Sequence, residues 1–130
     1  MTRLVPISML TLLLAGCGVR APIEPRADPY LPKQIHMDSQ RLRKDTAVGT
    51  PIVARDQSGL LVVTVPIRSA INKTLYVDYT VTFFDRNGNP IGNKLGPFTK
   101  TLDPNTPDSI TVNSTSPQAA DFQISFRYAR

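Results

Sequence analysis

The fold is decided by the stretch Leu75-Tyr-Val-Asp-Tyr-Thr-Val-Thr-Phe-Phe84, which runs directly into Asp85-Arg-Asn-Gly88. Every second residue from Leu75 to Phe83 is apolar or aromatic, and the residues between them include an aspartate and two threonines. Because successive side chains of a strand point to opposite faces, this alternation predicts a strand with one buried face. Asn-Gly is typical of a tight turn, since both residues tolerate a positive φ. We therefore expect an antiparallel hairpin here.

The same period of two recurs along the rest of the chain. It is found in four further segments: 52–54, 61–67, 110–112 and 122–128. Phe98 and Leu102 indicate one more strand, whereas residues 40–47 fit a turn or two of helix as well as an irregular strand. Pro66 stands late in its segment, so we expect it at a sheet edge or beside a bulge. Short strands separated by Gly and Pro turns predict an all-β fold, an antiparallel sandwich or barrel.

The N-terminal residues have the composition of an export signal. Arg3 is followed by an apolar run from Leu4 to Leu14, which is too short to span a bilayer, and then by small residues. Leu14-Ala15-Gly16-Cys17 resembles a bacterial lipoprotein signal. That resemblance implies cleavage between Gly16 and Cys17 and fatty acylation of Cys17. An ordinary signal peptide or a buried N-terminal helix is the alternative.

The only cysteine in the chain supports the lipoprotein hypothesis. A lone thiol in an exported protein has no disulfide partner, and acylation of Cys17 would remove it. Two or three acyl chains would hold the protein on a membrane. Gly18 follows the cysteine, where an acidic residue would favour the inner membrane, so we expect an outer-membrane lipoprotein that faces the periplasm.

Prolines separate this signal from the rest of the chain. Residues 18–32 contain four of the twelve prolines, which disfavour both helix and central strand. We expect three parts: a signal peptide at 1–16, the lipidated cysteine and a Pro-rich tether at 17–32, and a β-sandwich domain at 33–130. As an alternative to a simple spacer, Tyr30 and Leu31 could anchor a segment that becomes ordered on a partner.

The positive charge is modest and scattered. The formal net charge is +5, and the densest basic group is Arg41, Arg43 and Lys44, with acidic residues beside it. This group is either a solvated segment or a patch that rests on anionic head groups or an acidic glycan. We expect no nucleic-acid partner, because no basic stripe alternates with aromatic residues.

Several of these segments together resemble a known family. They are Gly59-Leu-Leu-Val-Val-Thr-Val65, Asn72, the stretch 75–88, Leu102-Asp-Pro104 and Phe122-Gln-Ile-Ser-Phe126. This pattern resembles the YcfL-like periplasmic lipoproteins, and its Phe-Asp-x-x-Gly turn is similar to that of small immunoglobulin-like envelope domains of the FxLYD type. The resemblance covers residues 50–130 and the lipoprotein signal. It implies a small immunoglobulin-like β-sandwich anchored in the envelope, and it supplies no functional residues.

The residues offer little catalytic chemistry. His36 is the only histidine and is expected to be a partly packed surface residue. Asp85-x-Asn87-x-Asn89 resembles the opening of a calcium loop, but Pro90 occupies the glycine position and Gly96 replaces the closing glutamate. Asp78 lies mid-strand, where we expect it to pair with a basic residue of a neighbouring strand. We therefore expect no enzyme, no cofactor and no metal.

An apolar outer face is the candidate for partner binding. Four residues project away from the predicted core: Leu60, Val62, Tyr76 and Phe84. An apolar patch of this kind often marks an interface. A second layer formed by residues 33–50, or the other sheet, could cover it instead.

Two functions fit this composition better than a third, an enzyme or a binder of small ligands, which would require a polar pocket that the alternation does not supply. The first is a non-enzymatic envelope lipoprotein that binds another protein as an accessory or assembly factor, through its outer face or by strand addition. The alternative is a lipoprotein component of an envelope-spanning secretion machine. In that case loops 85–97 and 103–109, at one end of the sandwich, would contact an inner-membrane partner.

Overall fold

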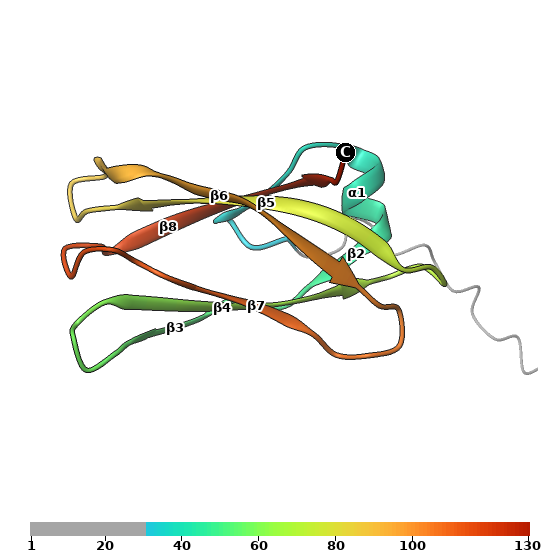
Figure 1. Cartoon of the computed structure of the whole chain (residues 1–130), viewed down its shortest axis with the longest axis horizontal. Coiled ribbons are helices and arrows are strands. Elements are labelled where there is room, and N and C mark those ends of the chain that lie inside the picture. Colours follow the sequence, from blue (N-terminus) through green and yellow to red (C-terminus); the bar gives the residue numbers. More distant parts are fainter. Residues whose placement is uncertain (1–30) are drawn as a thin grey trace, which may run out of the picture.

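A computed structural model describes residues 31–130, which form two packed β-sheets and one short helix (Figure 1). The all-β sandwich predicted from the sequence is confirmed. In chain order the elements are β1 (Ile35–Met37), α1 (Gln40–Asp45), β2 (Thr46–Val48), β3 (Ile52–Arg55), β4 (Leu61–Ser69), β5 (Leu75–Phe84), β6 (Pro90–Leu102), β7 (Ser109–Asn113) and β8 (Asp121–Tyr128).

The predicted hairpin lies in the larger sheet. Sheet one has the strand order β1-β8-β5-β6, and β5 pairs antiparallel with both β6 and β8. The short edge strand β1 runs parallel to β8, so the sheet is not purely antiparallel. Sheet two is built on β4, which pairs with β7 on one side and with β2 and β3 on the other.

Pro66 lies where the pairing partner along one side of β4 changes from β2 to β3. It lies inside β4, between the residues that pair with β2 and those that pair with β3. Its carbonyl oxygen accepts a hydrogen bond of 2.8 Å from the Gly49 N–H. Proline has no N–H to donate on that side of β4, but the pairing with β2 and β3 is interrupted there, so no hydrogen bond of the ladder is lost. A Cβ on Gly49 would lie 3.0 Å from the Pro66 Cβ, so a glycine fits best at this crossing.

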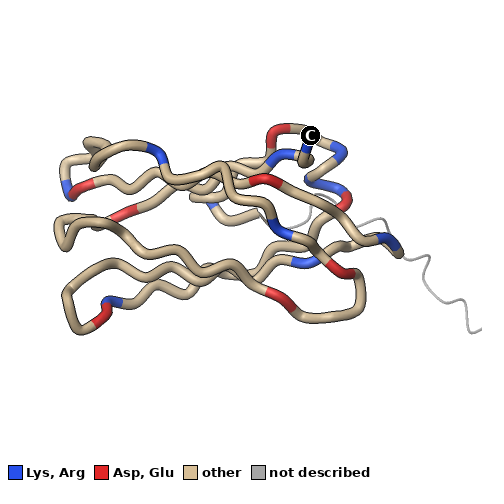
Figure 2. Tube along the Cα trace, in the orientation of Figure 1, with Lys and Arg blue, Asp and Glu red and all other residues tan. Residues whose placement is uncertain are grey.

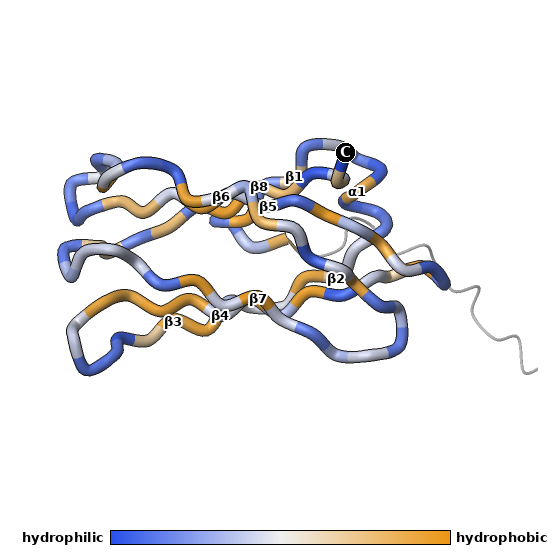
Figure 3. Tube along the Cα trace, viewed as in Figure 1, coloured by the Kyte–Doolittle hydropathy of each residue, from blue (hydrophilic) through white to orange (hydrophobic). Residues whose placement is uncertain are grey.

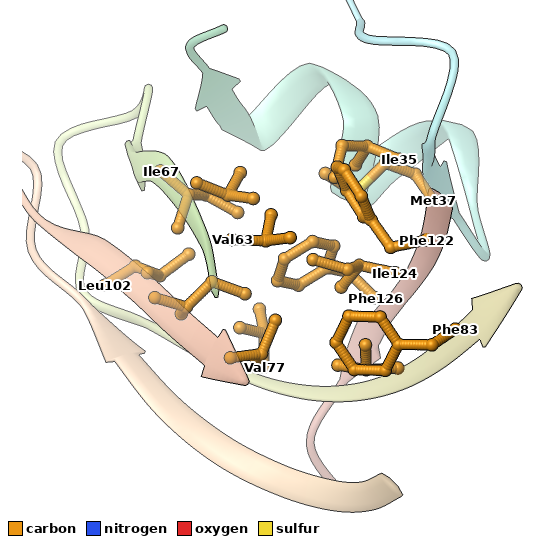
Figure 4. Packing of buried hydrophobic residues seen from close by; sticks show 14 of the residues in the cluster. Ile35, Met37, Val63, Ile67, Val77, Phe83, Leu102, Phe122, Ile124 and Phe126 are labelled. Carbon is orange, nitrogen blue, oxygen red and sulfur yellow. The ribbon is translucent and has the colours of Figure 1, made fainter. Parts of the chain in front are cut away.

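The core fills the space between the two sheets (Figure 4). Odd-numbered residues of β4 and β5 and even-numbered residues of β8 point inward, as the alternation predicted. The largest side chain with less than 2% exposure is Phe126, which packs with residues such as Val63, Val77 and Ile124. Hydrophobic residues concentrate on the strands, and hydrophilic residues mark the turns (Figure 3).

The segment that fitted both helix and strand contains one of each. The Ser39 hydroxyl oxygen caps α1 by accepting a 3.1 Å hydrogen bond from the Leu42 N–H. Leu42 is fully buried and joins the core at this end of the sandwich. The Thr46 hydroxyl donates to the Leu42 carbonyl oxygen at 2.7 Å, and the chain becomes extended there as β2 begins.

Two turns at one end of the sandwich use the same chemistry. In each, an aspartate side chain accepts hydrogen bonds from the N–H groups two and four residues later: Asp56 from Ser58 and Leu60, and Asp85 from Asn87 and Asn89. In each, the glycine three residues after the aspartate has a positive φ of about 80°. These turns connect β3 to β4 and β5 to β6.

The expectation that residues 85–97 form a loop is wrong, because residues 90–97 belong to the long strand β6. β6 pairs with β5 through two bulges: from Tyr79 to Phe83, β5 advances by two residues at each step, and β6 advances by three and then four. Gly96, with φ +101°, lies at the first bulge, where a Cβ would be 2.7 Å from the Tyr79 carbonyl oxygen. Bulges of this kind are common at sheet edges, which is where β6 lies.

Phe126 provides the direct test of this packing. Because its ring is buried between the sheets, Phe126→Ala should lower the free energy of unfolding by about 3–5 kcal/mol. Tyr76→Ala, which removes an aromatic ring that is 59% exposed, is the matched control and should have little effect. Chemical denaturation followed by circular dichroism measures both. Equal unfolding midpoints for the two variants would contradict the inward position of Phe126.

Candidate functional site

The predicted lipidation and cleavage positions, Gly16 and Cys17, lie outside the described residues 31–130. So do the signal peptide and all but the last two residues of the predicted tether. These assignments therefore stay predictions from the sequence. Within residues 31–130, no helix is long and apolar enough to cross a membrane.

The four residues predicted to form a partner surface lie on two different sheets. Val62 points outward from sheet two, opposite the buried side chains of β4, and Leu60 immediately precedes that strand. Tyr76 and Phe84 point outward from sheet one. Since the two outer faces of a sandwich look in opposite directions, these residues do not form one surface. Tyr76 is exposed, and the other three are partly buried.

The two loops assigned to one contact end also lie apart. The turn after Asp85 precedes β6, and residues 103–108 follow it. β6 runs the length of the sandwich between them, so the two loops are at opposite ends (Figure 1). The expected joint contact of loops 85–97 and 103–109 with an inner-membrane partner is therefore wrong in its geometry.

One group of polar side chains on the outer face of sheet one is centred on Asp78. Asp78 accepts a 2.7 Å hydrogen bond from the Thr99 hydroxyl, and its other oxygen lies 3.9 Å from Nε of Arg127, its cross-strand neighbour. This confirms the pairing expected for Asp78. His36 is exposed beside a shallow depression of about 270 Å³ that also contacts Asp78 and Arg127.

Apart from Asp78, the acidic residues of 31–130 lie in turns or at the ends of strands and of α1 (Figure 2). The Asp85 carboxylate accepts two backbone N–H groups of its own turn, which confirms the hairpin interpretation of the Asp-x-Asn-x-Asn sequence. In the part of the chain that the structure describes, no group of three His, Cys, Asp or Glu residues is placed to hold a metal ion.

Arg55 has a role that the sequence did not reveal. Its guanidinium donates hydrogen bonds to three carbonyl oxygens: Gly59 at 2.9 Å, Pro117 at 3.2 Å and Ala119 at 2.8 Å. These bonds join the β3–β4 turn to the loop between β7 and β8. Arg55, Gly59 and Pro117 also line an open depression of about 620 Å³ between these loops and the Asp85 turn. Because the three carbonyl oxygens that Arg55 binds belong to its own molecule, its role here is structural.

At the opposite end, α1 is tied to β8. The Tyr128 hydroxyl donates a hydrogen bond to Asp45, and Arg41 Nε lies 3.8 Å from the same carboxylate. The Arg41 guanidinium also lies 5.9 Å from the centre of the Tyr128 ring. Burial raises the pKa of Tyr128 to about 12, and the hydrogen bond to Asp45 acts in the same direction. Arg41, one member of the predicted basic group, thus contacts residues of its own molecule.

The β3 edge is the most exposed apolar strand segment. All four residues of β3 are exposed, including Ile52 at 62% and Val53 at 50%. Asp56 N–H bonds to the Leu60 carbonyl oxygen at 3.0 Å, so by alternation Ala54 and Ile52 also face β4. The backbone N–H and C=O groups of Val53 and Arg55 then face the other side, where no strand of residues 31–130 pairs.

Comparison with known proteins identifies the family. Residues 33–128 match DUF1425, described as a protein family of unknown function. The chain belongs to the DUF1425 family. No curated protein matches the sequence.

Two crystal structures share the fold of this DUF1425 chain. Campylobacter jejuni cj0090 has a TM-score of 0.63 and 16% sequence identity, over 75% of this chain and 100% of that chain. A DUF1425 family member from Shewanella sp. pv-4 has a TM-score of 0.54 and 22% identity, over 65% of this chain and 79% of that chain. At these identities the likeness concerns the fold alone.

The partly buried Tyr128 of this DUF1425 domain predicts a pH dependence. The raised pKa of Tyr128 means that the folded state favours the neutral phenol. The stability that Tyr128 contributes is therefore complete below pH 10, the ordinary tyrosine pKa, and is lost as the pH rises toward about 12. Tyr128→Phe should flatten the fall in unfolding free energy between these values, whereas Tyr76→Phe should not. Urea titrations across this pH range measure the slope. An unchanged slope in Tyr128→Phe would refute the coupling.

Proposed function

We propose that this DUF1425 chain is a lipoprotein of the bacterial outer membrane, held by acyl chains on Cys17 and facing the periplasm. Its sandwich binds another envelope protein as an accessory or assembly factor and catalyses no reaction. The Leu14-Ala15-Gly16-Cys17 signal and Gly18 support the address. The resemblance to the YcfL-like periplasmic lipoproteins supports both the address and the class.

The edge of β3, which no other strand of residues 31–130 covers, is the observation that supports protein binding. A strand edge presents unpaired N–H and C=O groups, and soluble proteins commonly protect such edges with bulges, prolines, charges or covering segments. β3 is regular, and three of its four residues are apolar. Its one charged residue, Arg55, is turned to carbonyl oxygens of its own molecule. An extended segment of a partner could therefore add to sheet two beside β3.

The lipid anchor would compensate for weak binding at the β3 edge. Each hydrogen bond of an added strand contributes only about 1 kcal/mol net, so a short edge alone binds weakly. Confinement of both proteins to one membrane or one compartment raises the effective concentration of the partner. Weak strand addition is then sufficient for an accessory role.

Lipidation can be tested by labelling. Cells that express the chain should incorporate radioactive palmitate into it, and Cys17→Ser should abolish the label because the acceptor sulfur is gone. Gly18→Asp is the control: it should keep the label and move the protein toward the inner membrane. An unlabelled wild-type chain, or label retained in Cys17→Ser, would refute the anchor.

Binding at β3 can be tested in intact cells. A photo-cross-linking side chain at position 52 should form one major adduct with an envelope protein. Val53→Pro removes a backbone N–H that faces away from β4, so the fold should survive while the adduct decreases by about tenfold or more. Tyr76→Lys, on the other sheet, should leave the adduct unchanged. An adduct that resists Val53→Pro would exclude strand addition at this edge.

A further inference from the structure

The two sheets differ in width. Across sheet one there are four strand positions, from β1 to β6. Across sheet two, within residues 31–130, there are three, because β2 and β3 share one side of β4 and β7 occupies the other. β6 and β7 are the edge strands on one flank of the sandwich (Figure 1). Because most inward residues of β6 are not buried, sheet one extends past sheet two on this flank.

This overhang leaves inward-pointing side chains of β6 partly uncovered. By their register with β5, the inward residues are Ile91, Leu95, Phe98, Lys100 and Leu102. Only Leu102 is buried, and Phe98 is 45% exposed although it points toward the core side. The Phe98 ring lies 5.3 Å from the Tyr79 ring, which in turn lies 5.8 Å from that of Phe126. The aromatic core thus reaches the surface here.

A groove follows this flank between β6 and β7. Its volume is about 210 Å³, and it is lined by Tyr79, Leu95, Phe98, Thr111, Val112 and Asn113. One wall is aromatic and aliphatic, and the other is the edge of β7. The groove is bounded toward the β6–β7 loop by an ion pair of 3.1 Å between Lys100 Nζ and Asp108.

The backbone of β7 presents a regular ladder to this groove. Ser114 N–H bonds to the Leu61 carbonyl oxygen at 2.8 Å, and Ile67 N–H bonds to that of Asp108 at 3.1 Å. By alternation, the backbone groups of Ile110 and Val112 also face β4. Those of Thr111 and Asn113 face outward, and no strand in the described part of the chain pairs with them.

We propose that the edge of β7 is a second binding site, which takes an extended segment of another protein as the fourth strand of sheet two. Side chains of that segment opposite Ile110 and Val112 would point inward and cover Leu95 and Phe98. Those opposite Thr111 would lie on the outer face, beside hydroxyl groups. The ligand is therefore a short segment with apolar residues at every second position and polar residues between them. This inference rests on the proposed protein-binding role and adds the site and the sequence pattern of the partner.

Other occupants fit this site less well. The chain's own residues 18–32 carry prolines at positions 22, 25, 29 and 32, which cannot donate to a ladder. A second copy could offer its β3 to β7, head to tail, which gives a ring or a growing polymer. It could also offer its own β7 about a two-fold axis, but this would bring the overhanging β6 strands of the two copies against each other. β6 is a poor acceptor, because its bulges and Pro97 interrupt its edge.

The test uses the full chain purified from the cells that express it, and a labelled probe peptide, Lys-Thr-Val-Thr-Phe-Thr-Val-Thr-Lys. Fluorescence anisotropy should show saturable binding, and hydrogen exchange at Thr111 and Asn113 should slow. A peptide of identical composition, with its apolar residues adjacent to one another, should bind about tenfold more weakly or not at all.

Matched variants assign the binding to this edge. Thr111→Pro should abolish binding, because it removes an N–H that faces the groove, whereas Thr111→Val keeps that N–H and should bind normally. Phe98→Ser should weaken binding by about tenfold, and Tyr76→Ser should not change it. Circular dichroism shows whether each variant is folded. If Thr111→Pro does not fold, Phe98→Ser provides the test.

Three outcomes would overturn the inference. They are the absence of saturable binding, equal affinity for both peptides, and loss of binding in Val53→Pro but not in Thr111→Pro. Particle mass that rises with protein concentration in the absence of peptide would instead identify a second copy as the occupant. None of these measurements depends on palmitate labelling or on the adduct at position 52, so the two proposals can fail separately.

Discussion

The structure depends on one packed layer of apolar side chains between two sheets. β5 and β8 contribute one wall of that layer and β4 the other, and side chains such as Phe126, Val77 and Val63 have almost no exposure. Burial of this surface is the main favourable contribution to folding, because each buried large apolar side chain contributes about 1.5–3 kcal/mol. In the described residues, the helix, the two aspartate turns and the Arg55 contacts close the ends of this layer.

Much of this architecture could be predicted from local pattern. The alternation in residues 61–67, 75–83 and 122–128 gave the correct inward faces, because the two-residue period of a strand depends only on the chain itself. The Asp85 turn was predicted for the same reason. The helix at Gln40–Asp45 was only one of two interpretations, because a six-residue helix shows too little of the helical period to be distinguished from a strand.

The errors arose where distant segments determine the outcome. Residues 90–97 contain Gly92, Gly96 and Pro97, which suggest a loop, yet bulges against β5 accommodate them in a strand. Alternation shows that Val62 and Tyr76 point away from the core, but it does not show that they belong to different sheets. The Arg55 contacts join residues 62 and 64 positions apart, so no local pattern predicts them. Within residues 31–130, the unpaired edges of β3 and β7 follow from sheet order, which is equally nonlocal.

The proline at the crossing from β2 to β3 has a consequence for how the sandwich could open. On that side of β4, Pro66 provides one hydrogen bond where a regular residue would provide two. Separation of β3 from β4 therefore meets a natural stopping point before it reaches β2 and the helix. Strand β3 could therefore separate from β4 while β2 stays paired and the helix end of the sandwich stays closed.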